Sequence, residues 1–429
     1  MARADRLFHP YALAALVLGL ALVAAPLVHH HYDVVDCFLA WSRASEGSRP
    51  WAVYTPGAGA DDCDYPPLVP YWLTLVEAAR RVTAAPEVGV LTLTLLKLPN
   101  LLAAFAGVPL CLLGLRAPFG ESAARYAATA CALSPALFVN GLWGQFDALL
   151  ALFVLAAVVA VLHDRPALAG VALGFGLATK LLAIVAAPLL AVYLFRRGGA
   201  KAVALASAAS AATMLALALP HVLGGAGDAV LRAYTGAVHY YPYRTAEAYN
   251  SWYVADRFDV LVRGLSYPDI RRDDRLAFGA VTYRALGLGA FVLATGMLMA
   301  TLWKRPHARV LVSAVTLHHF AFFMLPTQVH QRYIVPAVAL AAVLAAVRRE
   351  AAWLFFGLSL TATLNQALDL ARALPTTQVV RGALTADLFA LPLRTWRDLG
   401  AAVGLANISL FVAAVWVFWR GRASGDASE

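Results

Sequence analysis

Long apolar runs separated by short polar connectors make up most of the chain. A run of roughly 17–25 apolar residues is long enough to cross a bilayer as one helix. The pattern predicts about twelve transmembrane helices, at residues 11–28, 88–115, 123–139, 148–162, 167–179, 181–195, 202–219, 283–303, 310–325, 333–347, 351–368 and 401–419. We therefore expect an all-α polytopic membrane protein in which residues 1–429 form a single transmembrane domain.

The first apolar run has two readings. It follows Arg3 and Arg6, and Ala24-Ala25 resembles a weak cleavage site, as in a secretory signal peptide. The run is long enough to cross the bilayer, and the polar interval behind it carries candidate chemistry, so we favour a retained first span.

Two long polar intervals interrupt the apolar pattern, at residues 32–82 and 221–282. Within the first, residues 36–45 and 68–82 place apolar and polar side chains at helical spacing, with Pro66-Pro67 as a rigid start to the second helix. One face of that helix is apolar and excludes Glu77, Arg80 and Arg81; it comprises Leu68, Tyr71, Trp72, Leu75, Val76 and Ala79. This pattern is typical of an amphipathic helix lying at the membrane surface.

Composition supports a membrane protein and gives its orientation. The chain is 61% hydrophobic and 14% charged, outside the range of soluble proteins. Its net charge of +9 comes from Lys and Arg in alternate connectors, which marks the cytoplasmic side. The basic charge is therefore a topology signal, and we expect no nucleic-acid partner, contact with membrane lipids, cytoplasmic termini, and both long loops on the extracytoplasmic face.

The four cysteines fall into two pairs. Cys111 and Cys131 lie in apolar runs, where they are expected to pack as buried side chains. Cys37 and Cys63 share the 32–82 loop, and in an oxidising compartment a bridge between them would contribute roughly 3 kcal/mol. The sequence leaves open whether this disulfide forms.

Two acidic residues follow the first apolar run directly. Asp33 and Asp36 lie near the predicted water boundary, where an ionised carboxylate is costly without a partner or a task. Either could accept the proton of a bound hydroxyl group. The alternative is that both end a helix or pair with Arg43.

Basic groups occur where a lipid-linked phosphate could bind. The 328–332 turn places His330 and Arg332 at the external end of a predicted span, and a guanidinium can grip phosphate through two donors. Lys180 and Lys97 are secondary candidates for the same phosphate. The alternative for Arg332 is a side chain that extends to the lipid headgroups.

Aromatic and histidine clusters are less decisive. Tyr243, Arg244 and Trp252 belong to aromatic stretches at 239–244 and 250–253, which fit either sugar stacking or an interfacial belt. The 29–31 histidines point in different directions on a helix and have no matched ligand set, so we expect an interfacial edge and no metal site. His318-His319 could be a polar pair between helices or part of a cavity.

Four short elements occur in order and are expected on one face. They are the acidic start of the first loop with Asp36, then Asp64-Tyr65-Pro66-Pro67-Leu68, Trp143-Gly144-Gln145-Phe146-Asp147 and Gln328-Val329-His330-Gln331-Arg332-Tyr333. Over about residues 11–336 the set resembles the GT-C superfamily of integral-membrane glycosyltransferases. The second and fourth elements are similar to those of dolichyl-phosphate-glucose-dependent glucosyltransferases, the third and fourth to bacterial and archaeal polyprenyl-phosphate-mannose-dependent enzymes.

The resemblance implies roles for these residues. An acidic residue of the first loop would be the general base; spacing to Phe38 and Trp41 favours Asp36, with Asp33 second. His330, Arg332 and Lys180 would hold the donor phosphate. Substrate-binding residues would include Asp64, Tyr65, Gln145, Asp147, Tyr243, Arg244 and Trp252.

The resemblance also implies a reaction. A hexose, mannose or glucose, would pass with inversion from a polyprenyl-phosphate donor to a lipid-linked or glycan acceptor, at the outer face of a bacterial or archaeal plasma membrane. No cofactor is required, although some relatives use a divalent ion. The alternative is a transporter or lipid flippase, but those tend to place coupling residues near the midplane in two related halves, whereas here the polar groups gather on one face.

Overall fold

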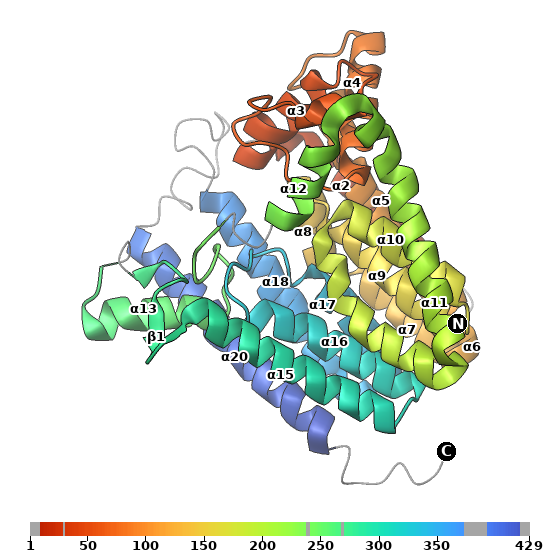
Figure 1. Cartoon of the computed structure of the whole chain (residues 1–429), viewed down its shortest axis with the longest axis vertical. Coiled ribbons are helices and arrows are strands. Elements are labelled where there is room, and N and C mark those ends of the chain that lie inside the picture. Colours follow the sequence, from red (N-terminus) through yellow and green to blue (C-terminus); the bar gives the residue numbers. More distant parts are fainter. Residues whose placement is uncertain (1–8, 29–30, 237–240, 267–269, 373–392, 421–429) are drawn as a thin grey trace.

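The computed structural model describes residues 9–28, 31–236, 241–266, 270–372 and 393–420, and nearly all of them are helical (Figure 1). Two short antiparallel strands, β1 (Leu276–Phe278) and β2 (Val281–Thr282), form a hairpin. The α-helices are α2 (Pro10–Ala24), α3 (Leu39–Ala44), α4 (Leu68–Thr83), α5 (Val90–Gly114), α6 (Arg116–Phe119), α7 (Glu121–Ala132), α8 (Pro135–Trp143), α9 (Asp147–Leu162), α10 (Pro166–Thr179), α11 (Ala187–His221), α12 (Gly227–Thr235), α13 (Ser251–Arg263), α15 (Tyr283–Lys304), α16 (Ala308–Met324), α17 (Val335–Val347), α18 (Ala352–Arg372) and α20 (Leu393–Arg420).

The fold confirms the predicted all-α polytopic class. Within the described ranges, five helical segments are long and apolar enough to cross a membrane: Pro10–Leu27, Val90–Gly114, Leu181–Thr235, Tyr283–Lys304 and Thr395–Trp419. Four more helices are apolar but shorter, namely α9, α10, α16 and α17. Helix α17 is the most enclosed, with every residue from Val335 to Ala345 buried, as expected for a helix that is apolar on all sides.

Three predicted helix boundaries can be compared directly. The expected break at Lys180 is confirmed, because this residue is extended (φ −163°, ψ 138°) between α10 and a 3₁₀ segment, Leu181–Ala186. The predicted helix at 123–139 is instead two helices, because Pro135 begins α8 after α7 has ended. The predicted spans 181–195 and 202–219 share α11, which bends at Gly199, where φ is 66°.

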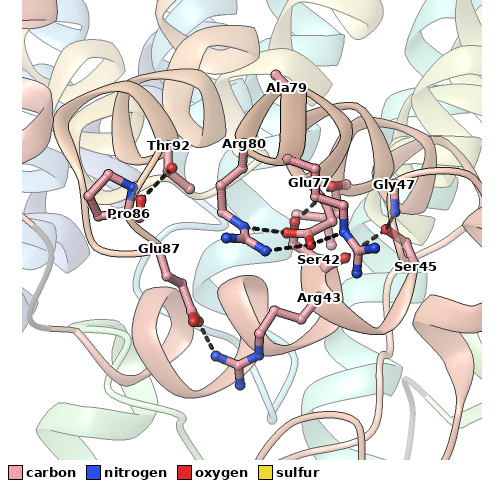
Figure 2. Close-up of polar contacts among 12 residues, drawn as sticks. Ser42, Arg43, Ser45, Gly47, Glu77, Ala79, Arg80, Pro86, Glu87 and Thr92 are labelled. Atoms are coloured by element: carbon pink, nitrogen blue, oxygen red, sulfur yellow. Dashed lines mark hydrogen bonds and ion pairs between the residues drawn. The ribbon is translucent and has the colours of Figure 1, made fainter. Parts of the chain in front are cut away.

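The first long loop folds into a compact unit around α3 and α4, shown in Figure 2. Ser42 on α3 donates from Oγ to the backbone oxygen of Leu73 on α4 at 2.8 Å. Glu77 accepts from Arg80 at 2.7 Å and from Arg81 at 2.7 Å, so its buried carboxylate is neutralised.

The amphipathic helix predicted at 68–82 is therefore present, but its buried face differs from the predicted one. Val69, Leu73, Val76 and Glu77 are buried, whereas Leu75 is 58% exposed. The sequence pattern placed Glu77 off the apolar face of the helix. Glu77 can be buried because Arg80 and Arg81, which follow it within about one turn, pair with its carboxylate.

All four cysteines are free thiols, so the bridge considered for Cys37 and Cys63 is absent. Both are buried in the packing of the first loop. Cys111 and Cys131 are also buried, and their Sγ atoms lie 3.8 Å apart where α5 meets α7. These two residues act as packing side chains, as predicted.

Candidate functional site

A cavity of about 310 Å³ lies between the Lys180 break, the 64–66 element, α15, α16 and the 326–333 turn. Its polar end is lined by Asp64, Lys180, His330 and Arg332. The remaining wall is largely apolar and includes Leu181, Ile184, Val185, Leu288, Phe291 and Phe322. The helical backbone of α10 ends at Lys180, which is extended, and the Lys180 side chain lines the polar end of the cavity.

Asp147 organises the cations of that polar end. It is fully buried as the first residue of α9, where the positive end of the helix dipole favours a carboxylate. Lys180 Nζ donates to Asp147 Oδ1 at 2.8 Å, and Arg332 Nε lies 3.5 Å from Asp147 Oδ2. Lys180 also lies 4.5 Å from the centre of the Tyr333 ring, a cation–π contact.

The position of α9 is fixed by amide side chains from two other helices. Asn140 Oδ1 accepts the backbone N–H of Ala148 at 2.9 Å, and Asn100 Oδ1 accepts that of Leu149 at 3.2 Å. These bonds satisfy helix-start donors that would otherwise be unpaired in an apolar environment.

Asp33 lies on the other side of Arg332. Its Oδ2 atom is 3.8 Å from Arg332 Nη1 and accepts a 2.5 Å hydrogen bond from Gln145 Nε2. Tyr65 in turn donates from its hydroxyl to Gln145 Oε1 at 2.8 Å. Since Tyr65 takes the amide oxygen, the amide nitrogen is directed at Asp33.

Asp36 does not share this environment. Its side chain is exposed, and it lines neither the large cavity nor the smaller one beside Asp33. The reason is that Asp33–Phe38 form a π-helix. A π-helix has more residues per turn than an α-helix, so a side chain three positions on lies farther from the face of the first. The structure brings Asp33, and not the favoured Asp36, to Arg332.

The polar end also shifts the ionisation of two of its groups. Burial, followed by the positive charges of Arg332 and Lys180, holds the pKa of His330 well below its usual range. His330 is therefore neutral at pH 7, packed between the Tyr241 and Tyr333 rings. Asp64 is accessible from the cavity, yet enclosure by the surrounding protein raises its pKa, against the lowering effect of Lys180 and Arg332.

Of the predicted substrate-binding residues, Asp64 and Tyr65 line the cavity, and Gln145 and Asp147 are buried without lining it. The other three lie elsewhere. Arg244 is 1% exposed and pairs with Asp256 at 2.5 Å, and Tyr243 stacks against a guanidinium of the same loop, 3.9 Å from its ring centre. Trp252 donates to the backbone oxygen of the residue that follows α16, at 2.6 Å, and so ties the second long loop to that helix.

Other candidates from the sequence also have structural roles. Lys97 donates to the backbone oxygens of Ala25, at 2.6 Å, and Val28, so it closes the end of the first helix and does not face the cavity. His318 bonds Thr295 at 2.8 Å between α16 and α15, the polar-pair alternative. Residues 29, 30, 239 and 240 lie outside the described residues.

Sequence reasoning did not single out several groups near the site. Tyr241, one residue of the aromatic stretch at 239–244, lines both cavities, and Arg284 lines the large one while its guanidinium pairs with Asp273 at 2.9 Å. His31 lies beside Asp33, and Asp369 lies beside His31. Asp369 was detectable, because an ionisable residue in an otherwise apolar helix is a functional signal.

The carboxylates of the site do not fit a metal ion. Asp33 faces Gln145 and Arg332, and Asp147 faces Lys180 and Arg332. In the part of the chain that the structure describes, no group of three or more His, Cys, Asp or Glu side chains is arranged to bind one. We therefore derive no step through a metal.

The helical membrane fold has a cavity with two cations and a carboxylate at its polar end, and this arrangement fits a membrane glycosyltransferase. The family model of glycosyltransferase family 87 matches residues 65–326, more than half of the chain. The chain belongs to that family, which confirms the resemblance predicted from the ordered motifs and makes it a glycosyltransferase, not a transporter.

Two solved structures, both of ArnT, share the fold, and a third, of an oligosaccharyltransferase, matches with a lower score. ArnT from Cupriavidus metallidurans in the apo state is 17% identical with a TM-score of 0.52, over 94% of this chain and 74% of that one. ArnT bound to undecaprenyl phosphate is 16% identical with a TM-score of 0.50, over 95% and 72%. The apo Archaeoglobus fulgidus oligosaccharyltransferase is 14% identical with a TM-score of 0.42, and 55% of its chain is covered. No curated protein matches.

Proposed function

We propose that this protein transfers a hexose, mannose or glucose, from a polyprenyl-phosphate donor to a lipid-linked or glycan acceptor. The observation that carries the proposal is the position of Arg332. It lies 3.8 Å from Asp33 and, together with Lys180, faces the cavity. A carboxylate that can take a proton is thus next to the cations that can stabilise a leaving phosphate.

The shape of the cavity supports a lipid phosphate as the donor. Arg332 and Lys180 offer charged hydrogen-bond donors for the phosphate, and neutral His330 offers one more. The apolar wall on α15 and α16 suits the first isoprene units. ArnT, which shares the fold, has been solved with undecaprenyl phosphate bound, and this accords with a similar donor here.

The proposed reaction is a single displacement with inversion. The acceptor hydroxyl oxygen attacks the anomeric carbon, the carbon–oxygen bond to phosphate breaks, and the phosphate leaves with the electron pair. Asp33 accepts the hydroxyl proton as general base. Lys180 and Arg332 stabilise the negative charge of the departing phosphate. Both cations are in position before the reaction because Asp147 holds them.

We further propose that the cavity opens on the extracytoplasmic side, with both termini in the cytoplasm. Support comes from the alternation of Lys- and Arg-rich connectors. Residues 32–82 and 221–282, the two long loops, each supply cavity-lining residues, such as Asp64 and Tyr241. Because residues of both loops line the cavity, we expect it to open on the membrane face on which the loops lie.

The test uses purified protein in detergent with labelled polyprenyl-phosphate mannose or glucose and a panel of lipid-linked and glycan acceptors. Asp33→Asn is expected to lower kcat on the order of 10²-fold or more, because the general base is removed. Asp36→Asn, in the same π-helix, is the matched control and should keep most activity. Transfer that survives Asp33→Asn but not Asp36→Asn would overturn the assignment of the base; no transfer by the wild type from any hexose donor would overturn the function.

A further inference from the structure

His31 lies between two carboxylates that come from opposite parts of the chain. Its Nδ1 atom is 3.3 Å from Asp33 Oδ2, and its Nε2 atom is 3.7 Å from Asp369 Oδ2 on α18. The imidazole is 15% exposed and packs edge-on against the Trp143 ring, with ring centres 4.6 Å apart. The ring is thus confined by an aromatic wall and two acids.

The contacts define which ring nitrogen carries the proton. The backbone N–H of Asp33 donates to His31 Nδ1 at 3.1 Å, so Nδ1 acts as an acceptor and Nε2 carries the hydrogen. The Nε2–H then faces Asp369. In this tautomer the one Nδ1 lone pair points to Asp33, whose backbone N–H occupies it, so a proton is received there when that hydrogen bond opens.

Asp369 is itself firmly placed. Gln331, next to Arg332 in the sequence, donates to Asp369 Oδ2 at 2.5 Å, and Arg372 donates to Oδ1 at 3.1 Å. Arg372 also pairs with Glu247 at 3.1 Å. A carboxylate held in this way can fix the orientation of an imidazole and stabilise its protonated form.

We propose that His31 accepts the proton that Asp33 takes from the acceptor, and that Asp369 positions His31 for this step. This inference rests on the proposed function. After displacement, Asp33 carries the former hydroxyl proton on its carboxyl group. That proton moves to the single lone pair of His31 Nδ1, as this lone pair gives up its hydrogen bond from the Asp33 backbone N–H. The transfer restores the Asp33 carboxylate and leaves an imidazolium whose Nε2–H faces Asp369. The imidazolium then releases the proton to water, and the base is ready for another turnover.

Charged groups surround His31. Asp33 and Asp369 face the imidazole directly, and Arg332 and Arg372 lie behind these two carboxylates. Replacing His31 removes a proton-accepting group from this cluster, so the pH profile of activity should differ from that of the wild type.

The experiment measures kcat, KM for the donor and the pH profile of His31→Gln, which retains a hydrogen-bonding side chain but cannot take a proton. We expect kcat to fall on the order of 10²-fold, KM to stay within about twofold, and the pH profile of activity to change. Added imidazole should restore part of the His31→Ala rate. Asp369→Asn should also lower kcat.

The matched control is His163→Gln, which removes a histidine bonded to a backbone oxygen at the far end of α9. It should leave all parameters unchanged. A His31→Gln enzyme with wild-type kcat and pH profile, or a loss that appears in KM and melting temperature without imidazole rescue, would overturn the inference. If wild type is active and Asp33→Asn inactive in the same assay, such a result refutes only the role of His31 and leaves the proposed function standing.

Discussion

Lys180 donates to Asp147 across 2.8 Å, which joins the extended link after α10 to the first residue of α9. Arg332 lies on the other oxygen of the same carboxylate at 3.5 Å. Two cations this close would repel each other without the shared anion. Asp147 therefore sets the spacing of the groups that we assign to the donor phosphate.

Removal of Asp147 alone should destabilise the protein. Asp147→Leu leaves Lys180 and Arg332 buried without their partner, and a broken buried pair typically costs about 3–5 kcal/mol. The double variant Asp147→Leu with Lys180→Met removes one uncompensated charge, so it should melt at a higher temperature than Asp147→Leu. Neither variant should transfer sugar. Thermal melting in detergent measures the difference.

The control for these variants is the ion pair between Arg197 and Asp164. Its nitrogen and oxygen atoms are 3.1 Å apart, but each of the two side chains is at least half exposed. Exposed pairs contribute about 0–1 kcal/mol, so Asp164→Asn should change the melting temperature little. A double variant no more stable than Asp147→Leu would show that Asp147 does not act through Lys180.

Arg332→Lys should weaken catalysis even though it keeps the positive charge. The guanidinium contacts Asp33 and Asp147 and still faces the cavity, and an ammonium group cannot reproduce that planar set of donors. We expect kcat/KM to fall by roughly 10- to 100-fold, the range for one charged hydrogen bond lost. Arg257→Lys is the control, because Arg257 is similarly buried and pairs with Asp398 away from the cavity. Equal losses in both variants would contradict a specific role.

The fold class and part of the candidate site could be predicted from the sequence, because both depend on where the apolar pattern is interrupted. Apolar run lengths predicted most of the helices, and the ordered motifs include Asp147 and Arg332, which lie 3.5 Å apart in the structure. Lys180, which bonds Asp147, was predicted from its place between two apolar runs. These residues sit at helix ends and breaks, where a break in the apolar pattern indicates their position.

The remainder depended on geometry that local pattern does not encode. The π-helix turns Asp36 away from Asp33, and α-helical spacing gives no sign of it. His31 and Asp369 are more than three hundred residues apart in the sequence, so their contact becomes visible only when α18 is packed in the fold. Arg244 resembled a sugar-binding residue because its sequence neighbours are aromatic, but its partner is Asp256 on α13.

Tyr65→Phe should lower the rate by removing one hydrogen bond. Without the hydroxyl that donates to Gln145 Oε1 at 2.8 Å, the Gln145 amide is free to turn its oxygen towards Asp33, which disturbs the base. A loss in kcat of about tenfold corresponds to one ordinary hydrogen bond. Tyr71→Phe removes a similar bond, from its hydroxyl to the Leu217 carbonyl at 2.9 Å, outside the cavity, and should be neutral. Tyr65→Phe activity equal to that of Tyr71→Phe would contradict this role.

The thiols of the first loop should react slowly in the folded protein. Burial raises the pKa of Cys37 to about 12, against the lowering effect of its hydrogen bonds, and burial followed by the charge of Asp64 holds the pKa of Cys63 well above its usual range. Since the thiolate is the reactive form, maleimide mass-tagging at pH 7–8 should label neither until the protein is unfolded in detergent. A Cys37–Cys63 disulfide on a non-reducing gel would contradict the structure, in which both are free.

Asp256 should make the protein less stable as pH rises from about 4 to about 7. Burial raises its pKa to about 7 despite the adjacent Arg244. Between the usual value near 4 and this value, the folded protein binds more protons than the unfolded chain, so the free energy of unfolding falls as pH increases from about 4 to about 7. Asp256→Asn cannot ionise and should lack this component. The melting temperature of Asp256→Asn relative to wild type should therefore increase with pH over that interval. A wild type that gains stability relative to Asp256→Asn as pH rises would mean that the Arg244 pair outweighs burial at this site.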